Sequence, residues 1–487
     1  MASFASGHAR RALTPLLEHA GEAIRSARPK QIALSGPAGF LGSRVLDAIL
    51  DAHDHRRACG LEPGEVVLLS SSPGNLMSRL MLQHGAKRMA SVRATRVDYY
   101  FQHDLDSWRD QLGSLGMGGP DAVFVNLAAL AGPRQDRPDA MMAVNYRAPL
   151  AAARACESLN FGHWIQSSTQ AVKAERAGQV PYSRWKAMAD HSLSRLEKLP
   201  VSVFTLGLLY CKEQGVVGQR GGDQLNMVDL TLLPITPVMG NGRAPLQPLE
   251  VTDAASRIAV VALTEPTNRP TQAPMKWCSG YDWARPKIDP AREYTWRAYD
   301  AVGPETMTML ELYQTFARLN GRVLKPVFVD YRNFEQVLNA ASLGNLNRQF
   351  VSLLRSEQDA ERPIVGNPET FETLLGENAT LFRMKDALNE RDDEGNRVRI
   401  ERRSFPVAGA ARWVWHNKGV VIPGVNLALE TVGTYLFGKR FGSDENWRWI
   451  RVGAMTSLLT TVSVASMHAG AEFSKWWEKW GGGFVGS

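Results

Sequence analysis

The stretch QIALSGPAGFLGSRVLDAIL, residues 31–50, decides the fold. A short apolar run leads into Gly36, Gly39 and Gly42, and a helical pattern begins directly afterwards. This order predicts a buried strand, a tight turn and a helix that starts close against the strand. The free N–H groups at the start of such a helix, and the positive end of its dipole, favour a phosphate. The stretch therefore predicts a site for the pyrophosphate of a dinucleotide, built from Gly36, Ala38, Gly39, Phe40, Leu41 and Gly42.

Further apolar runs follow as far as residue 330, with helical patterns between them. They read EVVLLSS (65–71), AVFVNLAAL (122–130), HWIQSS (163–168) and VSVFTLGLLY (201–210). Short, nearly continuous apolar strands are typical of a parallel sheet that helices cover on both faces. We predict a Rossmann-type, doubly wound α/β fold over residues 31–330, with a smaller C-terminal α/β subdomain. Residues 265–298 are rich in Pro and aromatics without periodicity, which predicts an insertion on the surface or against a partner.

Composition limits the possible classes of function. The chain has 487 residues, of which 44% are hydrophobic and 22% charged, so it can bury a large core in more than one unit. Its net charge of +7 is compatible with an anionic cofactor, an anionic membrane surface or a mitochondrial address. No basic run interleaved with aromatics occurs, so we expect no nucleic-acid partner. The four cysteines form no CxxC pair or Cys/His cluster, which predicts neither a metal site nor a disulfide framework.

Both ends of the chain differ from this central region. Residues 1–30 form a basic, amphipathic extension, which fits either an organelle-targeting segment or a surface helix. Residues 331–410 are predicted to be a charged helical extension, and residues 411–487 a Trp-rich one. Within the latter, Val452–Ala471 contains no Asp, Glu, Lys or Arg and is flanked by tryptophans. Its length and flanks suit a membrane helix, while its many hydroxyl side chains also suit a helix buried in a soluble complex.

The end of the second predicted strand bears on the choice of dinucleotide. NAD-binding proteins of this fold usually carry an acid there, which holds the ribose 2′-hydroxyl. This strand ends in Ser70 instead, and Arg44 or Arg79 could pair with a 2′-phosphate. The sequence therefore favours NADP(H) over NAD(H).

A second group of polar residues follows further along the chain. In PYSRWKAMAD (181–190), Tyr182 and Lys186 are four residues apart on a predicted helix, so they share one face. An ammonium beside a phenol lowers the pKa of the phenol and lets it act as an acid or base near neutral pH. The preceding strand ends in Ser167, Ser168 and Thr169, which can supply a hydroxyl to the same site.

Together these motifs resemble the extended short-chain dehydrogenase/reductases. The matching segments are GPAGFLG (36–42), HDLD (103–106), NLAA (126–129), VNY (144–146), SST (167–169) and YSRWK (182–186). The resemblance implies that Thr169, Tyr182 and Lys186 form a catalytic triad. It also places Asp104 and Leu105 beside the adenine, Ala128 beside the glycine turn, and the cofactor against Leu127, Ala128 and Ala129.

Residues 240–263 and 299–322 are similar to one branch of that family, which contains the nucleotide-binding accessory subunit of mitochondrial respiratory complex I. This similarity implies a structural NADP(H), with other subunits and membrane lipid as partners. It also implies the matrix side of the mitochondrial inner membrane, with a plastid membrane as the alternative. The chain departs from the family where Thr205 and Leu206 replace an Arg-Pro pair and Cys211 a Gly. This departure affects the nicotinamide end of the site, and so hydride chemistry more than cofactor binding.

Three functions remain open on these grounds. The first, which we favour, is a non-catalytic accessory subunit that holds NADP(H), with an inherited triad. The second is an active, membrane-associated NADP-dependent reductase or epimerase that uses Thr169, Tyr182 and Lys186. The third is a nucleotide-sensing or RNA-associated derivative of the fold, against which the missing basic aromatic patch argues.

Overall fold

The computed structural model describes one of the two compact units into which the chain divides. The first unit comprises residues 1–331 and 345–406, and the second residues 332–344 and 407–487. The described residues all belong to the first; they are 14–28, 30–130, 138–173, 181–211, 216–217, 231, 236–264, 296–319, 321–329, 365–376, 379–384 and 386. The predicted membrane segment 452–471 and most of the predicted insertion lie outside them. Among the helices described, none is long and apolar enough to cross a membrane.

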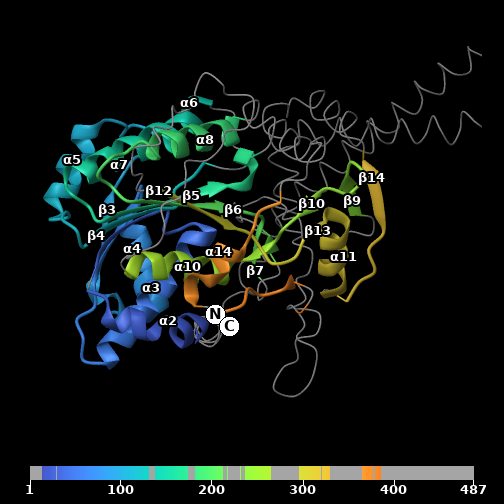
Figure 1. The fold of residues 1–487 in the computed structure, drawn as a ribbon, viewed down its shortest axis with the longest axis horizontal. Coiled ribbons are helices and arrows are strands. Elements are labelled where there is room, and N and C mark those ends of the chain that lie inside the picture. Colours follow the sequence, from blue (N-terminus) through green and yellow to red (C-terminus); the bar gives the residue numbers. More distant parts are fainter. Residues whose placement is uncertain are drawn as a thin grey trace, which may run out of the picture. The chain divides into compact units, whose positions relative to one another are not determined.

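A seven-stranded parallel sheet forms the centre of the first unit, in the order β12-β6-β5-β4-β1-β2-β3 (Figure 1). Its strands are β1 (Gln31–Ser35), β2 (Glu65–Ser70), β3 (Val92–Arg96), β4 (Ala122–Asn126), β5 (His163–Thr169), β6 (Val201–Leu206) and β12 (Trp296–Ala301). The chain winds outward from β1 to β3 and then returns to place β4 on the other side of β1. This reversal makes the carboxyl ends of β1 and β4 the switch point where such sheets bind ligands. The predicted Rossmann-type fold is confirmed.

Helices cover both faces of this sheet, as Figure 1 shows. One face carries α2 (Thr14–Ser26), α3 (Phe40–Ala58), α4 (Pro73–His84) and α10 (Val251–Leu263). The other carries α5 (Leu105–Ser114), α6 (Pro138–Met142), the π-helix η2 (Ala143–Arg147), α7 (Ala148–Ser158) and α8 (Pro181–Leu193). Short 3₁₀ turns η1 (Arg88–Ser91) and η3 (Gln170–Lys173) lead into β3 and follow β5.

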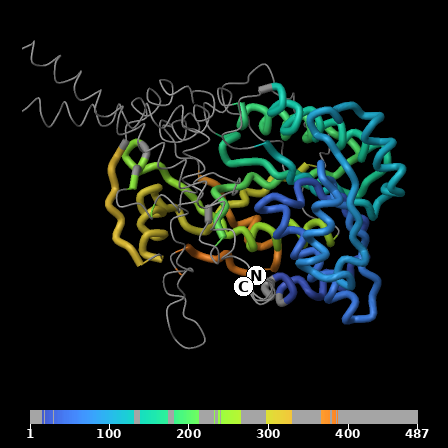
Figure 2. The backbone as a smooth tube through the Cα atoms, turned by 180° about the vertical axis from the view of Figure 1, so that it is seen from behind, coloured from blue at the N-terminus to red at the C-terminus, as the bar shows by residue number. Residues whose placement is uncertain are grey.

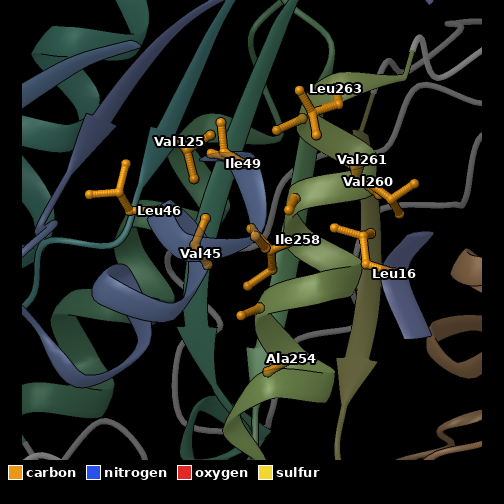
Figure 3. Close-up of a cluster of buried hydrophobic side chains, with 14 of the residues drawn as sticks. Leu16, Val45, Leu46, Ile49, Val125, Ala254, Ile258, Val260, Val261 and Leu263 are labelled. Atoms are coloured by element: carbon orange, nitrogen blue, oxygen red, sulfur yellow. The ribbon is translucent and has the colours of Figure 1, made fainter. Parts of the chain in front are cut away.

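The core beneath α3 and α10 is almost wholly aliphatic. Val45 and Ile49 of α3 meet Ile258 and Ala254 of α10 over Val125 of β4, and all five are buried (Figure 3). Each fully buried aliphatic side chain contributes about 1.5–3 kcal/mol from the removal of apolar surface from water. This packing fixes α3, and with it the glycine turn that precedes α3.

The smaller elements after β6 form the C-terminal α/β part of the unit. They are β7 (Leu209–Cys211), β8 (Val216–Val217), β9 (Thr236–Met239), β10 (Pro245–Leu246), β11 (Leu249–Glu250), β13 (Met307–Thr308), α11 (Met309–Leu319) and β14 (Pro326–Val329). They pair as β11-β7-β8, β10-β13 and β14-β9. Met309, Leu312 and Phe316 of α11 are buried against them.

The structure corrects the strand predictions at three places. The run VSVFTLGLLY is not one strand but two, because the chain breaks at Gly207, whose N–H donates to the carbonyl of Ala301 at 2.8 Å. Strand β3 (VRATR) has too few apolar residues to be predicted, since it lies at the sheet edge. Strand β12 begins at Trp296, inside the segment predicted as an insertion, because its backbone pairs with β6.

Segments from both ends of the unit are fastened to the sheet domain. The buried Arg56 guanidinium of α3 donates to the carbonyls of Ile24 at 2.8 Å and Ala27 at 2.7 Å, at the end of α2. The segment with α14 (Glu369–Glu372) and η6 (Thr373–Leu375) lies beside α10, as the rear view shows (Figure 2). Here the guanidinium of Arg257, which is fully buried, donates to the carbonyls of Phe371 and Ala379 at 3.1 and 3.3 Å.

Because two histidines are buried, we predict that the fold loses stability in mild acid. Burial, with Arg57 and Arg56 nearby, lowers the pKa of His53 to about 4, and burial lowers that of His163 to about 3. Both are neutral in the folded chain, whereas the unfolded chain binds a proton near pH 6.5. The contribution of these two histidines to stability is therefore constant above that pH and falls below it, by up to about 1.4 kcal/mol per pH unit for each group.

Urea unfolding at neutral pH and in mild acid measures this loss. His53→Gln is expected to reduce the slope of unfolding free energy against pH, while replacement of the exposed His103 by Gln leaves it unchanged. Equal slopes for the wild type and His53→Gln would contradict the prediction.

Candidate functional site

The glycine turn lies at the carboxyl end of β1, where the sequence places it. Gly36 has φ +68°, and a Cβ there would lie 2.9 Å from the backbone nitrogen of Ala128 on the neighbouring β4 loop. A Cβ on Gly42 would overlap the carbonyl oxygen of Gly36. Helix α3 starts at Phe40 with Gly39 as its N-cap, and no side chain caps it. The turn leaves Ala38 exposed while Leu41 is buried, so the first amides of α3 remain for a ligand anion.

A hydroxyl that the sequence reasoning missed joins β1 to β4. The Ser35 Oγ donates to Asn126 Oδ1 at 2.6 Å and accepts the N–H groups of Leu127 and Ala128 at 3.0 and 3.1 Å. The Asn126 amide then donates to Gln166 Oε1 of β5 at 2.9 Å. This buried chain fixes the start of the predicted segment 127–129 against the glycine turn. Ala128 is buried and Ala129 is exposed.

The same loop is held from the helix side by Asn145. Its side chain accepts the N–H of Leu130 and donates to the carbonyl of Leu130, both at 3.0 Å. Asn145 lies in the π-helix η2, and such irregular turns occur often at functional sites. The motif VNY drew attention to this position, but sequence gave it no role.

Tyr182 and Lys186 of the predicted triad lie on α8, and Thr169 lies at the end of β5. Lys186 is only 1% exposed, and its ammonium donates to the carbonyl of Ser167 at 2.9 Å. Tyr182, one turn earlier on α8, is half-buried. Thr169 ends β5, and its Oγ1 accepts the N–H of Ala171 at 3.3 Å.

The electrostatics of this group differ from the sequence expectation. Burial, and secondly the negative charge of Asp190, raises the pKa of Tyr182 to about 12. Asp190 is itself buried on α8 and accepts the hydroxyl of Ser168. Burial raises the pKa of Asp190 to about 7 and lowers that of Lys186 to about 8, while each charge favours the other. The lysine is thus balanced by Asp190, and the phenol stays protonated at neutral pH.

A third polar cluster lies at the carboxyl ends of β5, β6 and β12. Asp300 of β12 accepts the hydroxyl of Thr205 at 2.9 Å and the ammonium of Lys173. Gln170, the residue directly after Thr169, donates to the carbonyl of Thr205 at 2.8 Å. Thr205 stands where the family that this sequence resembles has Arg. A neutral hydroxyl that is hydrogen-bonded to Asp300 therefore occupies that position.

The segment 365–368 closes over this cluster. The N–H of Asn367 donates to Asp300 Oδ2 at 2.9 Å. Gly366 donates to Gln247 Oε1 at 2.7 Å and accepts from the amide of Gln247 at 3.1 Å. The segment therefore supplies partners to Asp300 and Gln247, although the buried Gln170 Oε1 has no hydrogen-bond partner among the described residues. No motif in the sequence predicted this closure.

At the other end of the site lie Arg44 and Arg79, the two arginines that the sequence suggests for a 2′-phosphate. Arg44 turns toward Asp47, at 3.6 Å between Nη1 and Oδ2, and toward Cys211 Sγ, at 3.8 Å from Nη2. Arg79 is exposed on α4.

The two residues predicted beside the adenine, Asp104 and Leu105, lie at the start of α5. The carboxylate of Asp104 accepts the N–H of Ser107 at 2.7 Å as the N-cap of α5, which holds the pKa of Asp104 below its usual range. Leu105 is exposed on the first turn. The residues that directly follow β3 are Val97, Asp98 and Tyr99, and the ring of Tyr99 packs on Trp108 at 5.7 Å.

Comparison with known proteins gives likeness of fold only. No family model and no curated protein matches the chain. UDP-glucuronic acid 4-epimerase from Bacillus cereus, solved with UDP-glucuronic acid and NAD, is 15% identical with a TM-score of 0.46, over 73% of this chain and 96% of that one. dTDP-glucose 4,6-dehydratase from Bacillus anthracis, solved with NAD, is 15% identical with a TM-score of 0.42, over 68% and 98%. UDP-glucose 4-epimerase from Thermotoga maritima, solved with UDP-glucose, is 13% identical with a TM-score of 0.41, over 62% and 85%. At these values the likeness carries no conclusion about the ligand or reaction of this chain.

Proposed function

We propose that the chain holds NADP(H) as a long-lived structural ligand in an accessory, non-catalytic subunit of a large membrane complex. The complex that fits best is respiratory complex I, with this subunit on the matrix side of the mitochondrial inner membrane. The fit of the dinucleotide is supported by the glycine turn, which no side chain fills and which opens on the uncapped start of α3.

The proposal that the subunit is non-catalytic rests on the pKa of Tyr182 and on the hydrogen bond that Lys186 makes. An acid or base works best when its pKa lies near the operating pH. The pKa of Tyr182 is raised to about 12, and the ammonium of Lys186 is directed to the Ser167 carbonyl. A nicotinamide dinucleotide would bring hydride chemistry to this site. A phenol with so high a pKa, however, transfers the accompanying proton poorly at neutral pH.

The closed edge at β6 and β12 supports the same conclusion. Gln170, beside Thr169, is bonded within the protein and lies under the segment 365–368. Opening this edge to a substrate would require the bonds of Asp300 to Thr205, Lys173 and Asn367 to be broken. The partly buried carboxylate of Asp300 would then lose these partners, which costs free energy.

The part of the proposal that concerns the complex rests on sequence. Residues 240–263 and 299–322 resemble the branch of the complex I subunit, and the Trp-flanked segment 452–471 provides a candidate contact with membrane or partner helices. The latter lies outside the described residues.

Native separation after mild detergent solubilisation tests the proposal. We expect the chain in a large band with respiratory subunits and with stoichiometric NADP(H). Tyr182→Phe is expected to leave nucleotide content and assembly unchanged, because the phenol takes no part in turnover. A small band whose nucleotide exchanges freely would contradict the proposal.

A second function is favoured by one observation. Thr169 ends β5, and the ammonium of Lys186 on α8 donates to Ser167 near that end, which supports an active NADP-dependent reductase or epimerase that uses Thr169, Tyr182 and Lys186. This function predicts that the isolated chain oxidises NADPH with a carbonyl substrate, and that Tyr182→Phe abolishes the reaction. The two functions therefore differ in the wild-type chain, because only the second predicts that it oxidises NADPH with a carbonyl substrate.

A further inference from the structure

We infer that Arg96, at the carboxyl end of β3, is the residue that selects a 2′-phosphorylated dinucleotide, together with Ser70 of β2. The inference rests on the proposed function, because it names the groups that recognise the ligand of that same site. It replaces the two arginines that the sequence suggested.

The strand register brings these two residues side by side. Ser70 and Arg96 are the last residues of β2 and β3, and they are direct partners in the parallel pairing. Neighbouring strands lie about 4.8 Å apart, so the Arg96 side chain starts one strand spacing from the position that normally reads the ribose 2′-hydroxyl. Serine at position 70 leaves that place without the usual carboxylate, which would repel a phosphate.

Alternation along the strands puts both side chains on the same face. Val66 and Leu68 of β2, and Val92 of β3, belong to the core beneath α3. Ser70 and Arg96 continue these two alternating series, so they share the face of the sheet that carries α3 and α4. The other series, with Val67 and Leu69, belongs to the core on the opposite face.

The charges around Arg96 also suit a phosphate. Arg96 is exposed, and among the described residues it forms no ion pair. By contrast, Arg93 on the same strand pairs with Glu65 at 2.7 Å. The nearby carboxylate of Asp98 accepts the N–H of Tyr100 at 3.0 Å within its own turn. A guanidinium with no carboxylate partner can bind a phosphate through two parallel hydrogen bonds.

The other arginines are less suitable for geometric reasons. Arg44 is engaged by Asp47 and Cys211. Arg79 lies nearly two turns into α4, which begins at Pro73, so the rise of the helix places it roughly 9 Å along the axis from the start of α4. Arg96 is the arginine that the strand register fixes beside Ser70.

Fluorescence titration of the full chain with NADPH and with NADH tests this assignment, with Arg96→Gln as the variant. Arg79→Gln is the matched control, because it removes another exposed arginine that forms no ion pair among the described residues. We expect the wild type to bind NADPH at least about tenfold more tightly than NADH, since hydrogen bonds to charged groups contribute about 1.5–3 kcal/mol. Arg96→Gln should remove this preference by weakening NADPH alone, and its unchanged affinity for NADH would show that the site is folded. Arg79→Gln should keep the preference.

Each other outcome has a distinct meaning. If the wild type binds both dinucleotides equally, or if the preference survives in Arg96→Gln, the inference is wrong while the dinucleotide site stands. If Arg79→Gln removes the preference instead, the assignment to Arg96 is likewise wrong. If neither dinucleotide binds, the proposed function itself fails.

Discussion

Replacing Gly42 by alanine is expected to abolish dinucleotide binding and to lower the free energy of unfolding by about 3 kcal/mol. The added Cβ would overlap the carbonyl oxygen of Gly36 and lie 2.8 Å from its carbonyl carbon. Neither atom can retreat easily, because both belong to the backbone of the turn, and the aliphatic core beneath α3 prevents the helix from moving away. Relief of the overlap must therefore shift the turn that would hold the pyrophosphate.

The measurements are urea unfolding and NADPH titration of the purified variant. Gly113→Ala, within α5, is the matched control, because a Cβ there meets no atom within 4 Å. The control should keep binding and gain roughly 0.5–1 kcal/mol, since alanine favours a helix more than glycine does. Normal NADPH affinity in Gly42→Ala would show that the turn does not hold the ligand.

The second large effect is expected from Arg257→Met, which should lower the free energy of unfolding by about 3–5 kcal/mol. The Arg257 guanidinium is fully buried, pairs with Asp253 at 3.2 Å and donates to the carbonyls of Phe371 and Ala379. It also stacks over the ring of Phe371, at 5.4 Å from the centroid. Methionine fills part of the volume but removes the guanidinium that donates to these carbonyls and pairs with the Asp253 carboxylate.

Loss of this arginine should be visible locally as well as globally. Hydrogen exchange at Phe371 and Glu372 is expected to rise more than exchange in β1, because the guanidinium fastens that segment to α10. Arg109→Met is the control: Arg109 is half exposed and pairs with Asp106 on the surface, so its loss should cost about 1 kcal/mol or less. Equal effects of the two variants would contradict the role given to Arg257.

Together these two predictions distinguish residues that hold the ligand from residues that only stabilise the fold. Gly42 should affect binding and stability together, whereas Arg257 acts on the segment with Phe371 and Ala379, which it fastens to α10. A variant at Arg257 that also loses NADPH would indicate that fastening this segment maintains the ligand site.

The sequence by itself determined the elements whose signals are local. The apolar run, the glycines and the helical pattern of residues 31–50 predict β1, the turn and α3, because each step follows from residues adjacent in the chain. The same holds for α8, where the spacing of Tyr182 and Lys186 needs only a helix to bring them to one face. The parallel sheet also follows, since its central strands are continuously apolar.

Only the tertiary structure decided what depends on residues distant in the chain. The edge strand β3 has a polar sequence and becomes a strand through its pairing with β2, and that pairing is what places Arg96 beside Ser70. Asp190 is an ordinary helical acid in the sequence. Tertiary packing buries Tyr182 and, secondly, places the charge of Asp190 where it also raises the pKa of the phenol. The closure by residues 365–368 joins segments separated by more than a hundred positions, as the bond of Gln247 to Gly366 shows. Local patterns specify elements, whereas partners, burial and charge are set by packing between elements, which no local pattern contains.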